Sequence, residues 1–332
     1  MHKKEFSVIK KCLKKASNIF IIGHKDIDLD AFGAAIGIYC YASFNKKDAY
    51  IILDDKKLED SVKKVIDSYS SKINIVKSGD INITIDSDSL LVIVDTNKKY
   101  LLQNPDIIEK FNNIIIIDHH GIGSNTVDLE NALLFIDSNA SSTCEIITNM
   151  LENDNLIVDK DVATTILAGI VLDTNNFVIK TNSSTYHAAY YLSNCGADSK
   201  AVQYLLKQNI KEYIEMQKVI TEVKIVKKIA ISKGLQTRIY RREDLAKIAD
   251  TILLFNNIEA SFVVGKIDGG IGISARSMGN INIGKIMEQF GGGGDNHEAA
   301  AKIKDKSLNE VITEITKIAK KIKEEENESS IH

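Results

Sequence analysis

Short apolar runs alternate with segments of helical periodicity along the first part of the chain. The runs are rich in branched aliphatic residues, apolar on both faces, and cover residues 19–22, 49–53, 90–94 and 114–117. Strands of this kind are typical of a parallel sheet that is covered on both sides. Apolar positions recur at helical spacing over residues 5–16, 31–42 and 58–69, which predicts helices. The alternation predicts an α/β fold.

The pattern becomes mainly helical after residue 117 and changes again near residue 223. We expect helices over residues 143–151 (with Ser142 as N-cap), 162–172, 184–195 and 200–222. Beyond them, strand-like segments at 224–231, 259–264 and 271–275 alternate with helical segments at 243–255 and 283–290. This alternation predicts a second, smaller α/β domain. The predicted division is a first domain at 1–195, a helical linker at 196–222, a second domain at 223–325 and a tail at 326–332.

Acidic and imidazole side chains follow three of the predicted strands where each strand ends. Asp95 directly follows one of these runs. The other two runs are followed by His24, Asp28 and Asp30, and by Asp118, His119 and His120. Since the carboxyl ends of parallel strands line one crevice, we expect these side chains to converge. Asp173, which follows the apolar helix at 162–172, brings a fourth segment to the same place.

Several carboxylates in one crevice repel each other unless cations neutralise them. Two divalent ions balance the four carboxylates of Asp28, Asp30, Asp95 and Asp173, with His24 and His119 as neutral ligands. Oxygen and imidazole ligands without thiolate suit Mn²⁺, Fe²⁺ or Zn²⁺. Two-metal hydrolases use such a pair of ions, and Asp95 is the candidate bridge. Each aspartate alone could equally be a turn or helix cap, so the prediction depends on their conjunction.

The charge and the apolar content of the chain exclude some classes of binding partner. The 42 basic and 45 acidic side chains leave a formal charge of −3, which argues against binding long nucleic acid but permits a short nucleotide. No apolar run has the length of a signal peptide or a membrane span. Four widely spaced cysteines indicate neither a zinc knuckle nor a redox dithiol. We therefore expect a cytoplasmic chain that makes no membrane contact of its own.

Several motifs resemble those of the DHH phosphoesterase superfamily. They are Gly-His-Lys-Asp-Ile-Asp-Leu-Asp-Ala (23–31), Val-Asp-Thr (94–96), Asp-His-His (118–120) and Gly-Ile-Val-Leu-Asp-Thr (169–174). Ala-Ser-Phe-Val (260–263), Ser-Ala-Arg-Ser (274–277) and the four glycines at 291–294 resemble the DHH-associated domain. Within the superfamily, Ala-Ser-Ser-Thr-Cys-Glu (140–145) and Ile-Met-Glu (286–288) are most similar to the catalytic module of cyclic-di-AMP phosphodiesterases.

This resemblance implies a role for each matching position. His24, Asp28 and Asp95 match the ligands of one manganese ion, and Asp30, Asp95, His119 and Asp173 match those of a second. His120 is the expected proton donor or phosphate ligand, and Asp118 is expected either to be catalytic or to orient His119 as a carboxylate behind that ligand. The expected substrate contacts are Ser274, Arg276, Ser277, Gly291, Gly292, Gly293, Gly294 and His297. The implied reaction is hydrolysis of cyclic di-AMP to pApA by a hydroxide that the two metals activate.

The chain also departs from the family pattern. Asp295 follows the glycines where the family has a phosphate-binding histidine, and Ser184 stands where an arginine is expected. A carboxylate repels phosphate, so we expect His297 either to take over or to face solvent. The glycines, followed by an expected helix start, predict a phosphate cradle rather than a simple hinge. Two alternatives stay open: hydrolysis of short linear nucleotides (nanoRNA, pApA or pAp), and a weakly active or non-catalytic nucleotide sensor. A homodimer and a membrane-anchored parent protein are also left open.

Overall fold

The computed structural model describes residues 3–54, 58–69, 72–79, 85–122, 126, 132–207 and 209–328. The chain separates into two compact units, Met1–Lys207 and Gln208–His332. Each unit has its own six-stranded sheet and its own apolar core. Within the described ranges, no helix is long and apolar enough to cross a bilayer.

The sheet of the first unit is parallel at every neighbouring pair of strands. In sheet order its strands are β3 (Ile75–Val76), β2 (Asp48–Ile52), β1 (Asn18–Ile22), β4 (Leu90–Val94), β5 (Asn113–Asp118) and β6 (Ala132–Ile136). The four predicted runs correspond to β1, β2, β4 and β5. The predicted α/β fold with a parallel N-terminal sheet is therefore confirmed.

The strand order reverses between β1 and β4 in the middle of this sheet. The next strand after β1 is its neighbour β2 on one side, whereas the strand after β4 is β5 on the other side. The crevice outside the carboxyl ends of strands at such a switch point is where open α/β sheets bind ligands. The segments that follow β1 and β4 carry His24, Asp28, Asp30 and Asp95.

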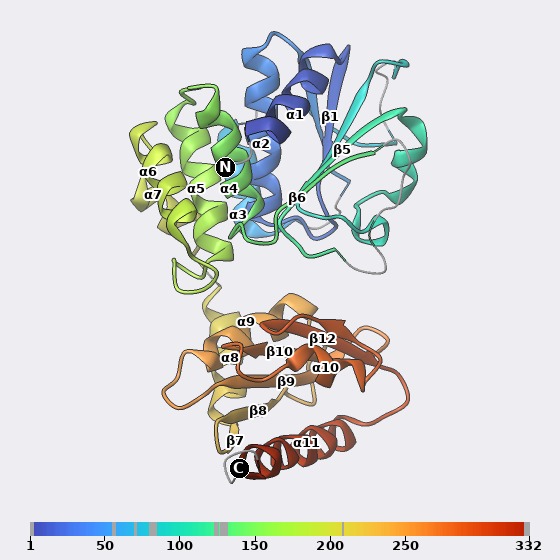
Figure 1. Ribbon diagram of the computed structural model, residues 1–332, viewed down its shortest axis with the longest axis vertical. Helices are drawn as coiled ribbons and strands as arrows, with labels where there is room; N and C mark the ends of the chain where they lie inside the picture. Colours follow the sequence, from blue (N-terminus) through green and yellow to red (C-terminus); the bar gives the residue numbers. More distant parts are fainter. Residues whose placement is uncertain are drawn as a thin grey trace. The chain divides into compact units, whose positions relative to one another are not determined.

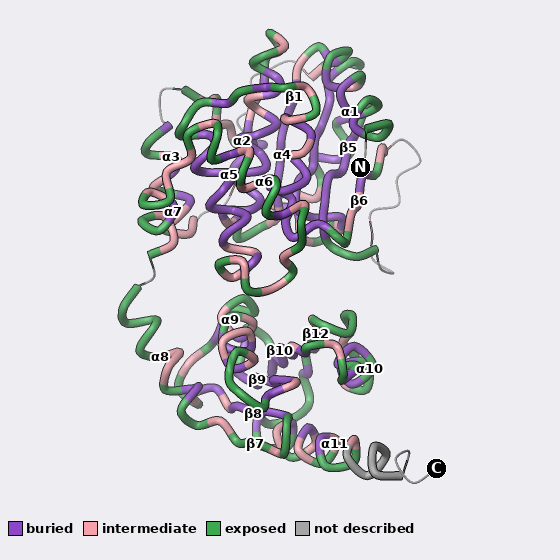
Figure 2. The backbone as a smooth tube through the Cα atoms, turned by 60° about the vertical axis from the view of Figure 1, so that its left-hand side comes forward, coloured by how far each residue is buried: buried purple, intermediate pink, exposed green. Residues whose placement is uncertain are grey.

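The α-helices pack against one face of the parallel sheet, and the short 3₁₀ helices pack against the other. The α-helices are α1 (Lys3–Lys15), α2 (Leu29–Phe44), α3 (Asp60–Tyr69), α4 (Thr143–Asn153), α5 (Lys160–Asp173), α6 (Ser183–Asn194) and α7 (Ser199–Leu205), and the 3₁₀ helices are η1 (Lys99–Leu101) and η2 (Pro105–Lys110). Helix α2 lies between the sheet and helices α4 and α5 (Figure 1). It is buried on nearly all sides for this reason. Figure 2 shows the buried backbone concentrated in the strands, with exposed segments on outer helices such as α3 and α7.

The second unit is a smaller sheet with helices on both faces. Its strands, in sheet order, are β11 (Gly293–Gly294), β12 (Glu298–Ile303), β10 (Gly270–Ser277), β9 (Ala260–Ile267), β8 (Ile229–Lys233) and β7 (Lys224–Val226). Only β8 and β9 pair in parallel. Helices α8 (Ile210–Thr221) and α9 (Arg242–Leu253) contribute to one core cluster, and α10 (Ile283–Glu288) and α11 (Leu308–Glu328) contribute to another.

Some predicted elements differ from the structure. The segment after residue 117, predicted as helical, contains the edge strand β6. The single helix predicted at 200–222 is divided into α7 and α8, because the Asn209 side chain accepts a hydrogen bond from the backbone N–H of Lys211 and starts a new helix. The predicted linker at 196–222 is thus shared between the two units. Of the predicted tail, residues 326–328 continue α11, and residues 329–332 lie outside the described residues.

Candidate metal centre

The turn after β1 places His24 and Asp28 beside each other. The Nε2 atom of His24 lies 3.7 Å from Oδ1 of Asp28 and 3.3 Å from Oδ2 of Asp95. Its other ring nitrogen, Nδ1, is 2.8 Å from the carbonyl oxygen of Lys25, which fixes the orientation of the ring. Asp28 is also the N-cap of α2, since its Oδ1 accepts hydrogen bonds from the backbone of Asp30 and Ala31.

Asp30 lies in the first turn of α2 and is fully buried. Its Oδ2 accepts a 2.8 Å hydrogen bond from the backbone N–H of Thr143, and its Oδ1 accepts another of 2.8 Å from Cys144. The carboxylate of α2 is therefore held by the N-terminus of α4, more than a hundred residues along the chain. Such a carboxylate still has free lone pairs on both oxygens for a cation.

Asp95 occupies the middle of the site. It has a φ of +59°, a left-handed conformation that is uncommon for a residue other than glycine. Its backbone N–H donates to the carbonyl of Ile117, which ties the end of β4 to the end of β5. Its Oδ1 lies 3.4 Å from Nε2 of His119, while its Oδ2 faces His24. One carboxylate thus faces two separate imidazoles, as a bridging ligand requires.

The two histidines at the end of β5 have different neighbours. Nε2 of His119 lies 3.1 Å from Oδ2 of Asp173, the last residue of α5, and 3.9 Å from Oδ2 of Asp30. Asp118 instead contacts His120, because its Oδ1 lies 2.8 Å from Nδ1 of that ring. An ionised carboxylate can only accept, so His120 donates from Nδ1 and presents Nε2 elsewhere. About half of the His120 side chain (49%) is exposed, whereas that of His119 is buried.

Two groups of three potential ligands result from these contacts. His24, Asp28 and Asp95 form one group, and Asp30, His119 and Asp173 form the other; within each group the ligand atoms lie within 4.8 Å of one another. Asp95 also groups with His119 and His120, so it adjoins both sets. All six ligands predicted from the sequence converge at this one crevice of the first unit.

The donor set fits divalent cations. Nε2 of His119 is buried and has no hydrogen-bond partner among the described residues, although three carboxylates surround it. Burial, reinforced by the negative charges of Asp95 and Asp173, raises the pKa of Asp30 well above its ordinary value. Burial likewise raises the pKa of Asp173. Carboxylates that repel each other in this way gain most from a bound cation, and mixed oxygen and imidazole donors suit a first-row divalent metal.

The pKa values of two of the imidazoles are shifted in the direction that favours the charged form of the ring. Burial opposes a charge on His24, but hydrogen bonds to Asp28 and Asp95 raise its pKa well above the ordinary value. Burial also opposes a charge on His120, but the hydrogen bond to Asp118 and the charge of Asp95 raise its pKa to about 9. Burial would raise the pKa of Asp95, yet the surrounding imidazoles hold it below the ordinary value. Perturbed groups of both signs in one crevice are typical of a functional site.

Thr143 contacts Asp95, and the sequence pattern did not predict this contact. Its hydroxyl donates a 2.9 Å hydrogen bond to Oδ1 of Asp95. The Ser-Ser-Thr-Cys-Glu segment predicted only a helix start, and Ser142 is indeed the N-cap of α4. No local signal in the sequence separates a threonine that contacts a distant carboxylate from one that belongs to a cap.

The expected substrate residues on β10 of the second unit are engaged in local contacts. Nε of Arg276 donates a 2.7 Å hydrogen bond to Asp250 of α9, and its Nη2 lies 3.9 Å from Oε2 of Glu298. Ser274 is buried and 3.4 Å from the same guanidinium, and the buried hydroxyl of Ser277 accepts from the backbone N–H of Gly279. These three residues stay predictions as substrate contacts.

The glycine segment pairs with a strand. Gly293 and Gly294 form β11 against β12, so the helix start predicted after the four glycines is wrong. A Cβ on Gly292 would lie 2.1 Å from the carbonyl oxygen of Ala300, which shows how closely the two segments approach. Gly291 has a φ of +70° at the turn that leads into this pairing. The cradle role of Gly291, Gly292, Gly293 and Gly294 stays a prediction.

Asp295 and His297 form a turn directly after the glycines. Oδ1 of Asp295 accepts hydrogen bonds from the backbone N–H groups of His297 (2.7 Å) and Glu298 (2.8 Å). The exposed ring of His297 lies over Gly279, with Nδ1 3.3 Å from the carbonyl oxygen of Ser277. Asp295 therefore has a clear structural role in shaping the segment that carries His297.

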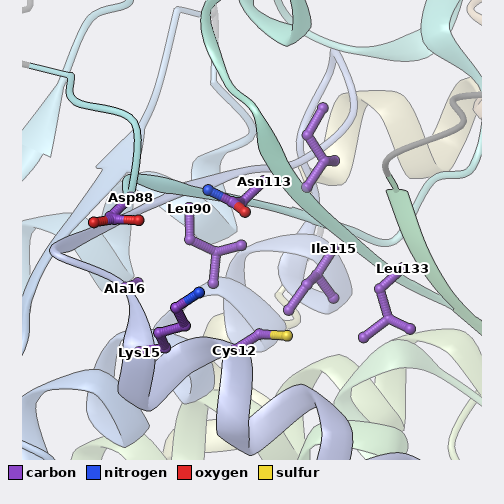
Figure 3. Close-up of a pocket in the computed structure, with 9 residues that line it drawn as sticks. Cys12, Lys15, Ala16, Asp88, Leu90, Asn113, Ile115 and Leu133 are labelled. Carbon is purple, nitrogen blue, oxygen red and sulfur yellow. The ribbon is translucent and has the colours of Figure 1, made fainter.

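A cavity of about 190 Å³ lies elsewhere in the first unit (Figure 3). Its lining includes Cys12 and Lys15 of α1, together with Leu90 and Asn113, the first residues of β4 and β5. It is at the amino ends of these strands. The predicted ligands follow the carboxyl ends, so this cavity is separate from the candidate metal centre.

Known proteins resemble the chain over most of its length. The cyclic-di-AMP phosphodiesterase GdpP of Geobacillus thermodenitrificans is 34% identical over 310 residues, covering 91% of this chain and 47% of that protein. The bifunctional oligoribonuclease and PAP phosphatase NrnA of Mycoplasma genitalium is 25% identical, covering 92% of this chain and 95% of that protein. The chain spans about half the length of the curated cyclic-di-AMP phosphodiesterases that it matches.

The fold has a close solved counterpart, and both units match known domains. The crystal structure of an exopolyphosphatase-related protein from Bacteroides fragilis has a TM-score of 0.77 at 18% identity and covers 96% of this chain and 95% of that one, which shows a shared fold. Residues 18–170 match the DHH family, N-terminal domain, and residues 208–324 match the DHHA1 domain. The chain therefore contains an N-terminal domain of the DHH family followed by a DHHA1 domain.

Proposed function

We propose that this chain is a divalent-metal-dependent phosphodiesterase that hydrolyses cyclic di-AMP to linear pApA, with Mn²⁺ as its metal. The observation that carries the proposal is the pair of ligand groups that adjoin at Asp95. The 34% identity to the phosphodiesterase GdpP over 91% of the chain supports the choice of substrate. A small nucleotide is the partner that this site would bind, and a homodimer stays a prediction.

The residues have separable tasks in such a reaction. His24, Asp28 and Asp95 would hold one cation, and Asp30, Asp95, His119 and Asp173 the other. When bound, two divalent cations neutralise charge on the phosphoryl oxygens and lower the pKa of an attacking water. The hydrogen bonds to the backbone of Lys25, Thr143 and Cys144 hold the ligands His24 and Asp30 in place, as a preorganised site requires.

His120 is positioned to act on the substrate itself. Asp118 holds the ring at Nδ1, so Nε2 is the ring atom left to meet a nucleotide. We propose that this atom either gives a proton to the leaving 3′ oxygen or donates a hydrogen bond to the phosphate. Both roles need a proton on Nε2, and the contacts with Asp118 and Asp95 favour the protonated ring.

Incubation of the purified chain with cyclic di-AMP and Mn²⁺ tests the proposal. We expect pApA as the product on ion-exchange chromatography, and no turnover when a chelator removes the metal. We expect kcat/KM for cyclic di-AMP to exceed that for pApA or pAp by about tenfold or more, which corresponds to roughly 1.4 kcal/mol of transition-state discrimination. Absence of pApA under saturating Mn²⁺ would contradict the proposal.

A second candidate function is hydrolysis of short linear nucleotides. It is favoured by the relative NrnA, which is 25% identical over 92% of this chain and 95% of its own length. The same substrate panel separates the candidates, because this function predicts faster release of mononucleotides from pApA or nanoRNA than cleavage of cyclic di-AMP. Binding of cyclic di-AMP without any turnover would instead favour the non-catalytic sensor.

Replacing Asp295 by asparagine tests whether the segment after the four glycines of the second unit faces substrate phosphate. Asparagine keeps an oxygen that can accept the two turn hydrogen bonds and removes the negative charge. If the segment faces substrate phosphate, we expect the KM for cyclic di-AMP to fall about two- to fivefold, as one weak charge repulsion of up to 1 kcal/mol is removed. Asp268→Asn, an exposed change in the β9–β10 turn, is the matched control. An unchanged or higher KM for Asp295→Asn argues against phosphate binding at this segment.

A further inference from the structure

The N-terminus of α4 contacts two of the proposed ligands at once. Backbone N–H groups of Thr143 and Cys144 donate to the two carboxylate oxygens of Asp30, each at 2.8 Å. The hydroxyl of Thr143 donates to Oδ1 of Asp95 at 2.9 Å. All four residues are buried. One residue, Thr143, thus joins the carboxylate of one ligand group to the carboxylate that adjoins both.

The hydroxyl of Thr143, like that of Thr185 in α6, which donates to Oε2 of Glu145, bonds to a distant side chain rather than to its own helix. Thr148, Thr164, Thr165 and Thr174 donate to the carbonyl oxygen four residues earlier in their own helices. This is the usual local bond of a helical threonine. Thr143 donates instead to a residue 48 positions away. Nor is it needed to cap α4, because Ser142 accepts the capping bond from the N–H of Glu145.

The position of Asp95 explains what this hydrogen bond does. The two oxygens of its carboxylate have different neighbours. Oδ1 accepts the bond from Thr143 and lies 3.4 Å from the buried Nε2 of His119, whereas Oδ2 faces His24. Without the hydroxyl, the carboxylate could rotate about its terminal torsion, which is broad for aspartate.

We propose that Thr143 is a positioning residue that orients the shared carboxylate of Asp95 for metal binding. The inference rests on the proposed metal centre, and it does not depend on which nucleotide is hydrolysed. Groups that hydrogen-bond to metal ligands typically change metal affinity by about 10–100-fold when removed. The contribution of the Thr143 hydroxyl should therefore be measurable as a change in metal affinity, without any substrate.

Calorimetric titration of MnCl₂ into the metal-free full chain tests this role. Thr143→Val keeps the shape and removes the hydroxyl, and we expect it to weaken Mn²⁺ binding by about 10–100-fold. Thr143→Ser keeps the hydroxyl and should bind within about threefold of the wild type, a rescue that packing alone does not predict. Thr148→Val is the matched control, since Thr148 is equally buried in the same helix and contacts only that helix through its hydroxyl.

A second pair of variants keeps the test valid if Thr143→Val does not fold. If circular dichroism shows that Thr143→Val is unfolded, Thr143→Ala and Thr143→Ser are compared, because these two side chains differ by the hydroxyl alone. Equal Mn²⁺ affinity in that pair overturns the inference, as does an equal loss in Thr148→Val and Thr143→Val. A wild-type chain that binds no Mn²⁺ overturns both this inference and the proposed function, whereas normal Mn²⁺ binding without any nucleotide turnover contradicts the function alone.

Discussion

Asp95→Asn is expected to lower the kcat for cyclic di-AMP by at least about 10³-fold, because it removes the one carboxylate that adjoins both ligand groups. The amide has nearly the same shape as the carboxylate, so the fold around it should persist. An amide oxygen carries no net charge, however, and cannot bridge two cations as a carboxylate does. Loss of several kcal/mol of transition-state stabilisation by the metals corresponds to such a factor at about 1.4 kcal/mol per tenfold.

The part of the stability that depends on Mn²⁺ is the quantity that this change should affect most. Asp95 adds to the repulsion that raises the pKa of Asp30, but the surrounding imidazoles hold the pKa of Asp95 below its ordinary value, so removal of its charge should leave the metal-free Tm unchanged or lower. The increase in Tm on adding Mn²⁺, which measures binding to the native state, should shrink. Differential scanning calorimetry with and without Mn²⁺ gives both quantities from one preparation.

A carboxylate at the other end of the same strand provides the control. Asp88 precedes β4 and lines the cavity at the amino ends of the strands, whereas Asp95 follows β4. Asp88→Asn should keep kcat and the Mn²⁺-induced increase in Tm within about twofold of the wild type. More than a tenth of wild-type activity in Asp95→Asn would show that the two ligand groups do not depend on this residue.

The convergence of the candidate metal ligands could be predicted from the sequence, because the carboxyl ends of parallel strands lie at one edge of the sheet. Asp95 and His119 each follow a buried apolar run, and the carboxyl ends of such strands share one edge of the sheet. Asp173 was harder to place, since it follows a helix rather than a strand. Both its place after the apolar helix and its motif predict that it joins the other ligands, and α5 brings its Oδ2 to 3.1 Å from Nε2 of His119.

Contacts that depend on packing between helices could not be predicted in this way. Thr143 and Asp95 meet because α4 packs against α2 and β5. The contact between Asp118 and His120, rather than His119, depends on a backbone turn that also brings the N–H of His120 to the same carboxylate oxygen. Neither fact follows from residue type or spacing.

Besides the two-residue strands β3 and β11, the sequence did not predict β6 and β12, and these two were missed for different reasons. β6 is an edge strand with partly exposed residues, so it lacks the fully apolar signature of the inner strands. β12, Glu-Ala-Ala-Ala-Lys-Ile, consists mostly of residues with high helix propensity. Pairing with β10 and β11 overrides that propensity. Burial alternates along β12, but the three consecutive alanines give no matching alternation in the sequence.

The site also depends on how closely α5 approaches α2, and Gly169 sets this distance. A Cβ at Gly169 would lie 2.5 Å from Sγ of Cys144, 2.8 Å from the carbonyl oxygen of Leu29 and 3.0 Å from Cα of Asp30. The last two are backbone atoms at the start of α2, which cannot rotate away. Any larger residue must therefore push α5 away from the segment that carries Asp30.

Gly169→Val is expected to lower the free energy of unfolding of the first unit by at least about 3 kcal/mol, the upper part of the usual range for overpacking a core. The gain in helix propensity on replacing glycine is under about 1 kcal/mol and does not offset this. Urea denaturation followed by circular dichroism measures the loss, and hydrogen exchange of peptides from α2 and α5 assigns it to this unit. Gly79→Val is the control, because a Cβ at that exposed position would have no atom within 4 Å.

Removing one of the three close contacts should recover only part of the loss. Cys144→Ala deletes the sulfur that a Cβ on Gly169 would meet first, but leaves the backbone of Leu29 and Asp30 in place. In a double-mutant cycle, Gly169→Ala should therefore cost less in the Cys144→Ala background than in the wild type, by about 0.5–1 kcal/mol. A free energy of unfolding of Gly169→Val within about 1 kcal/mol of the wild-type value would contradict the prediction. It would mean that α5 and α2 pack more loosely than the distances at Gly169 indicate, and that the position of Asp30 does not depend on this helix contact.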